Sequence, residues 1–132
     1  MDAIGFGQFS VSAFFAIVFL QSGLDKFVDR EGNLSYITGF FANTALKPLA
    51  PLMFWAIAVL ETIAGLLAAL GALIVLVGGG TLVAFWGLVF STISLLCLLF
   101  GNRIAKEYGG AVVIATYFAV ALLGLLLLQA PA

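Results

Sequence analysis

Four long apolar runs divide this 132-residue chain, and they constrain its fold more than any other feature of the sequence. Hydrophobic residues make up 64% of the chain and charged residues 8%, whereas a soluble domain carries about 25% charged residues. Each run has the roughly 20 mostly apolar residues that a helix needs to cross a bilayer. The runs lie at about residues 4–24, 49–77, 81–100 and 109–128.

The lipid environment of the four apolar runs determines their secondary structure. Backbone polar groups in hydrocarbon must bond within the protein, so each run is expected to be a helix. The run lengths and the lack of strict alternation argue against transmembrane strands. We therefore expect a single all-α domain over residues 1–132, a membrane-embedded four-helix bundle. The triple glycine at 78–80 predicts a tight antiparallel hairpin of the second and third spans.

The basic residues indicate an orientation. All five lie in the connections 25–48 and 101–108: Lys26, Arg30, Lys47, Arg103 and Lys106. Loops rich in Lys and Arg stay on the cytoplasmic side of a membrane. We therefore expect both connections to be cytoplasmic and both termini periplasmic, in a bacterial-type inner membrane. The net charge of −1 argues against nucleic acid as a partner.

The connection 25–48 opens with a cluster of charges and continues as a predicted short helix. Lys26 and Arg30 are expected to anchor the end of the first span at the interface, with Asp25 and nearby acids neutralising them. Asn33 is placed as the N-cap of a helix, with apolar residues following at helical spacing. This interfacial helix is either an amphipathic linker or a lid over a cavity for a lipid or quinone.

Glu61 is the one ionisable residue deep within a run. A charge at the bilayer centre costs about 2.5–3.5 kcal/mol on insertion scales, so Glu61 is expected to face the other helices. Counting about 1.5 Å per residue from the start of its span places it near mid-membrane. Small residues at helical spacing share its face and would let a neighbouring helix approach closely: Ala58, Gly65, Ala68 and Ala72.

Polar residues in the other spans are candidate partners for this carboxyl: Gln21, Ser22, Ser91, Thr92, Ser94, Thr116 and Tyr117. Lys26 is the obvious cation, but the same count places it some 15 Å shallower than Glu61. A contact would require the second span to begin deeper in the membrane than this placement has it. Glu61 is then either a proton acceptor or hydrogen-bond partner for a quinone head group, or a protonated carboxyl that fixes helix register.

Three short motifs carry a resemblance to a known family. They read "FLQSGLDKF", "LKPLAP" and "AVLETIAGLLAALGAL", within residues 10–75. The chain resembles the DoxX family of small four-helix membrane proteins, and the matching positions are Gly23, Lys26, Phe27, Glu61, Gly65 and Gly71. The resemblance implies either a subunit of a quinone-linked sulfur or terminal oxidase system, or a membrane partner of redox enzymes.

Three functions stay open on this sequence. With no histidine and only Cys97 as a thiol, the chain offers no imidazole or paired-thiol ligands, so we expect no metal site and, at most, a bound quinone or lipid. The first function is a non-catalytic accessory subunit of a larger redox or energy-transducing complex, packing against partner helices and lipid. The second is a quinone-binding or quinone-linked oxidoreductase subunit that uses Glu61. The third is a small transporter, which the scarcity of charges disfavours.

Overall fold

The structure is a computed structural model and describes residues 1–131. Its elements are α1 (Ala3–Val28), α2 (Arg30–Phe40), the 3-10 helix η1 (Lys47–Leu49), α3 (Ala50–Leu76), α4 (Leu82–Ile104) and α5 (Tyr108–Leu128). No strand occurs in the described range, so the predicted all-α class is confirmed. Four of the helices, α1, α3, α4 and α5, are long and apolar enough to cross a bilayer. The chain is a multi-pass membrane protein.

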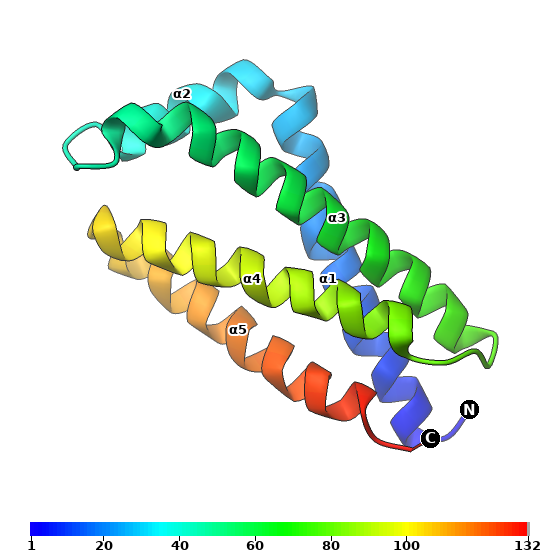
Figure 1. Cartoon of the computed structure of the whole chain (residues 1–132). Helices are drawn as coiled ribbons and strands as arrows, with labels where there is room; N and C mark the ends of the chain where they lie inside the picture. The colour runs from blue at the N-terminus through cyan, green and yellow to red at the C-terminus, as the bar shows by residue number, and fades with distance from the viewer. Residues whose placement is uncertain (132) are drawn as a thin grey trace.

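The long helices form a bundle in which α3 is central. Helix α3 packs against α1 on one side and α4 on the other, and α5 packs mainly against α4. Both termini lie at one end of the bundle, while α2 lies at the other end beside the start of α3 (Figure 1). The predicted hairpin is present: α3 and α4 are antiparallel neighbours, and Gly78 in their turn has a φ of 82°, which only glycine adopts readily.

The end of α1 differs from the prediction. Helix α1 continues to Val28 and therefore contains Lys26, which we had placed in a connection. Helix α2 begins at Arg30, so the prediction of Asn33 as its N-cap is wrong. The Asn33 amide instead donates to the Asp25 and Asp29 carbonyls, at 3.2 and 2.9 Å. It caps the last turn of α1, where carbonyls run out of helical partners.

Glycines bring the helix backbones into contact at the crossings. A Cβ atom placed on Gly65 of α3 would lie 2.6 Å from the backbone nitrogen of Leu20 in α1. A Cβ on Gly87 of α4 would lie 2.6 Å from the backbone nitrogen of Ala68 in α3. Without a hydrophobic force between helices in lipid, such close packing is a main source of their association. The small-residue face of α3 is buried throughout: Ala58, Gly65, Ala68 and Ala72.

The end that carries the termini is fastened by side-chain hydrogen bonds to α5. The amide of Gln8, in α1, is buried and donates to the carbonyls of Leu127 and Ala130, both at 3.1 Å. The hydroxyl of Thr81 donates to the carbonyl of Leu128 at 2.9 Å. These bonds satisfy carbonyls at the end of α5 that have no partner in the helix.

We expect Gly65→Val to destabilise the bundle. The new side chain would overlap the α1 backbone, and overpacking costs about 1–3 kcal/mol. The measurement is the free energy of unfolding in mixed micelles, followed by circular dichroism. Gly39→Val is the matched control, because a Cβ on Gly39 of α2 would meet nothing within 4 Å. Equal stability of the two variants would contradict the packing described here.

Candidate functional site

Three side chains from α1 and α3 form a buried polar cluster. The Lys26 ammonium lies 2.6 Å from Glu61 Oε1. The Ser22 hydroxyl donates to Glu61 Oε2 at 2.7 Å and accepts from Lys26 Nζ at 3.0 Å. Glu61 is 2% exposed and Lys26 12%, so this is an ion pair removed from solvent. It is the one ion pair within residues 1–131.

The contact with Lys26 corrects the depth estimate made from the sequence. Helices α1 and α3 are antiparallel, and Gly65 lies against Leu20 while Gly23 lies against Thr62. This register places Glu61 level with about Leu24, only some 6 Å from the end of α1 at 1.5 Å per residue. The start of α3 therefore projects beyond the end of α1, so the expectation that a contact needs a deeper start of the second span is wrong. Counting from that start placed Glu61 too deep relative to α1.

The direction of a helical side chain completes the explanation. The Cα–Cβ bond of a helical residue tilts toward the N-terminus of its helix. The Lys26 side chain accordingly runs back along α1 toward Ser22, one turn earlier, and its Nζ meets Ser22 and Glu61. The i, i+4 spacing of Ser22 and Lys26 was a sequence signal that both lie on one face of α1.

A cavity of about 400 Å³ adjoins this cluster. Helices α1 and α5 are in contact near Phe14 and Tyr117, whose ring centroids are 5.8 Å apart, and diverge toward α2 (Figure 1). The cavity lies in this divergence, and because its lining residues Ile17 and Gln21 are exposed, it opens on the flank of the bundle. We call it the α1/α5 cavity, and its lining is Ile17, Val18, Phe19, Gln21, Ser22, Glu61, Leu95, Leu98, Ile114 and Tyr117.

Only some of the candidate polar partners gather around Glu61. Gln21 and Tyr117 line the same cavity as the carboxylate, and Ser22 bonds to it directly. The other hydroxyls donate to the carbonyl four residues earlier in their own helix, which is how Ser and Thr satisfy themselves in an apolar helix. These are Ser91, Thr92, Ser94 and Thr116, with donor–acceptor distances of 2.8, 2.8, 2.8 and 3.0 Å.

The predicted interface charges lie at the junction of α1 and α2. Asp25 accepts a hydrogen bond from the Asn33 amide at 3.1 Å. Arg30 is exposed and forms no ion pair with a neighbouring acid within the described residues. The two basic residues of the cluster thus differ, since Lys26 points into the bundle while Arg30 lies at its surface.

A comparison with family models places these residues in context. A family model described as DoxX matches residues 13–94, more than half of the chain. The chain belongs to the DoxX family. The DoxX match includes Ser22, Lys26 and Glu61 and extends into α4, beyond the motifs seen in the sequence, while α5 lies outside it. No curated protein and no solved structure matches the chain significantly.

The Lys26–Glu61 pair is expected to show strong energetic coupling. Lys26→Met leaves a buried carboxylate without its cation, which costs about 3–5 kcal/mol of unfolding free energy. The double variant Lys26→Met/Glu61→Leu is expected to be no less stable than that single variant, because neither charge remains. A double-mutant cycle of unfolding free energies measures the coupling. The control is Lys47→Met, at an exposed and unpaired lysine. Additive effects of Lys26→Met and Glu61→Leu on the unfolding free energy would refute the coupling.

Proposed function

We propose that this DoxX-family protein binds a quinone head group in the α1/α5 cavity and acts as a small membrane subunit of a redox complex. The observation that carries the proposal is the ion-paired carboxylate of Glu61 in the wall of a cavity open to the bundle flank. A few convergent polar groups in a mostly apolar pocket are typical of small-molecule sites. Because Lys26 neutralises Glu61, a neutral ligand suits this cavity better than an ion.

The polar groups of the cavity suit the carbonyl of a quinone. The Gln21 amide and the Tyr117 hydroxyl both belong to residues that line the cavity, and both can donate to a quinone carbonyl. Glu61 Oε1 is buried and accepts no well-aligned hydrogen bond in this part of the chain, although it faces Lys26. A quinol hydroxyl would reach this atom, which has almost no accessible surface, only by displacing the Lys26 ammonium.

The location of the cavity suits a lipid-soluble ligand. Its mouth lies on the flank of a helix, α1, that is long and apolar enough to cross a bilayer. A quinone could enter sideways from the hydrocarbon, and its isoprenoid tail could stay in lipid. The volume of about 400 Å³ is within the range of about 300–1,000 Å³ of small-molecule pockets.

The subunit role follows from the electron path. A quinone exchanges electrons with a donor or acceptor, and this chain has no histidine and a single cysteine with which to hold a metal cofactor. We therefore assign the electron-transfer centre to a partner protein and the quinone contact to this chain. The structural alternative, in which the ion pair only fixes α1 against α3, predicts no ligand in the cavity.

Binding of a short-chain ubiquinone analogue tests the proposal. Each net hydrogen bond is worth about 0.5–1.5 kcal/mol, so Gln21→Leu and Tyr117→Phe are each expected to raise the Kd about 2- to 10-fold. Titration calorimetry in detergent micelles measures this. Thr116→Val is the control, because Thr116 neighbours Tyr117 but bonds only within α5. Absence of binding by the unmodified protein would refute the quinone site.

The subunit role has its own test. After solubilisation in a mild detergent, the native protein is expected to migrate with a larger assembly that carries haem or another redox chromophore. Native gel electrophoresis with in-gel absorbance measures this. Migration of the protein alone, with quinone still extractable from it, would retain the binding site but reject the subunit role.

A further inference from the structure

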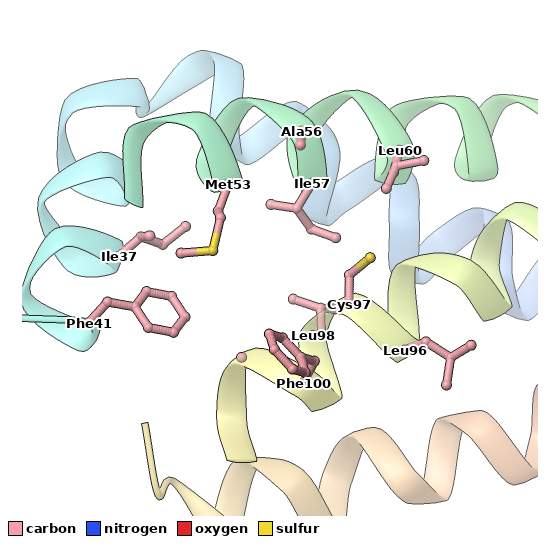
Figure 2. Close-up of a pocket in the computed structure, with 11 residues that line it drawn as sticks. Ile37, Phe41, Met53, Ala56, Ile57, Leu60, Leu96, Cys97, Leu98 and Phe100 are labelled. Carbon is pink, nitrogen blue, oxygen red and sulfur yellow. The ribbon is translucent and has the colours of Figure 1, made fainter. Parts of the chain in front are cut away.

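A second cavity lies at the α2 end of the bundle, between α2, α3 and α4. It has a volume of about 410 Å³, and Figure 2 shows side chains from all three helices pointing into it. The sulfur atoms of Met53 and Cys97 are its only side-chain atoms other than carbon and hydrogen. We call it the α2 cavity, and its lining is Ile37, Phe41, Met53, Ala56, Ile57, Leu60, Leu96, Cys97, Leu98, Phe100 and Gly101.

Phe41 closes this cavity at the end of the bundle. Phe41 is 6% exposed, and its ring lies against α4, where a Cβ atom on Gly101 would be 3.1 Å from Phe41 Cζ. The exposed members of the lining instead lie along the flank, at Ala56 of α3 and at Leu96, Cys97 and Phe100 of α4. The cavity therefore opens sideways between α3 and α4, on surfaces that would face lipid tails.

The charges around this end of the bundle are separated. Where α2 begins, the three acids Asp25, Asp29 and Glu31 outnumber the exposed basic residue Arg30. Near the other end of α2, where Phe41 meets α4, the chain carries three exposed basic residues against the single acid Glu107. These basic residues are Lys47 at the start of η1, Arg103 in the last turn of α4, and Lys106 between α4 and α5. The end of the α2 cavity is thus basic, while its interior has no charge.

We propose that the α2 cavity binds one acyl chain of an anionic phospholipid, and that Lys47 and Arg103 hold the phosphate. The uncharged lining suits a hydrocarbon chain, each buried CH₂ of which contributes about 0.8 kcal/mol. The Arg103 guanidinium stacks on Tyr108, 4.8 Å from the ring centroid, and forms no ion pair within residues 1–131. Its charge is therefore available for a phosphate, which guanidinium groups bind well.

The enclosure of the cavity favours a lipid chain over a partner protein. A transmembrane helix with its side chains is about 10–12 Å across, whereas this space lies between three helices of one chain and is closed by Phe41 at one end. Leu98 lines both this cavity and the α1/α5 cavity, so the two are neighbours with a shared wall. The lipid proposal does not depend on the quinone proposal.

Lipid retention is the primary test. The protein is reconstituted in vesicles of equal phosphatidylglycerol and phosphatidylcholine, extracted in mild detergent, and its bound lipid is quantified by mass spectrometry. We expect retained lipid enriched in phosphatidylglycerol. Ala56→Phe, which narrows the mouth, is expected to reduce retention about tenfold, or about 1.4 kcal/mol. Leu66→Phe, at an exposed position of α3 outside the cavity, is expected to retain lipid normally.

The head-group contact is tested by surface substitutions that leave the core unchanged. The double variant Lys47→Gln/Arg103→Gln is expected to retain lipid but lose the preference for phosphatidylglycerol. A preference that persists in this variant would overturn the assignment of the two basic residues. Equal retention of both lipids by the unmodified protein, or of neither, would overturn the proposal.

The single cysteine of the chain is a reporter within the cavity. Phosphatidylglycerol added to delipidated protein is expected to slow alkylation of Cys97 by N-ethylmaleimide, and Ala56→Phe is expected to abolish the lipid effect. Equal slowing by phosphatidylcholine would overturn the anionic selectivity.

Loss of ubiquinone-analogue binding in Ala56→Phe would instead identify the cavity as part of the quinone site and overturn the phospholipid assignment. Normal quinone binding with lost lipid supports two separate sites.

Discussion

A charged carboxylate in a lipid-embedded bundle needs a cation and hydrogen-bond donors, and the packing of α1 on α3 supplies them. Gly23 and Gly65 lie close to this level, both on its side toward the chain termini, and let the two backbones touch. Only with the helices this close can Lys26 and Ser22 of α1 reach Glu61 of α3, at 2.6 and 2.7 Å. The ion pair therefore depends on the close glycine packing.

Two cavities follow from the way the helices separate away from this contact. The α1/α5 cavity has the polar groups of the ion pair in its wall, and the α2 cavity is lined by apolar residues alone. They share Leu98 and lie toward the same end of the bundle. One small chain can thus present a site for a polar head group and a separate site for a hydrocarbon chain, both entered from the bilayer.

The sequence predicts the helices well because lipid leaves the backbone few alternatives. The inward position of Glu61 also follows from the cost of exposing a charge to hydrocarbon. The partner of Glu61 could not be chosen from residue counts, because the register of α1 against α3 depends on where Gly23 and Gly65 meet the other backbone. Lys26 was discounted for this reason, although its spacing from Ser22 already placed the two on one helix face.

Other errors have local causes. Asn33 looked like an N-cap because its side chain can serve either end of a helix, and here it binds the carbonyls that end α1. Ser91 and Thr92 looked like partners of Glu61, but each can bond within its own helix without any tertiary contact. A cavity under the short helix of 25–48 was one of the two alternatives for that segment, and Ile37 and Phe41 do line the α2 cavity. The position and lining of the two cavities could not be predicted, because both arise from the angles at which α5 and α2 leave the bundle.

The central place of α3 has a mechanical consequence. Glycine contacts join α3 to α1 through Gly65 and to α4 through Gly87, whereas α5 buries only Ala111, Ala121, Gly124 and Leu128. A pulling force applied at the C-terminus would therefore meet its weakest resistance at α5. Once the bonds from Gln8 and Thr81 gave way, α5 would leave first, and α1, α3 and α4 would remain as a three-helix remnant still locked by the Lys26–Glu61 pair.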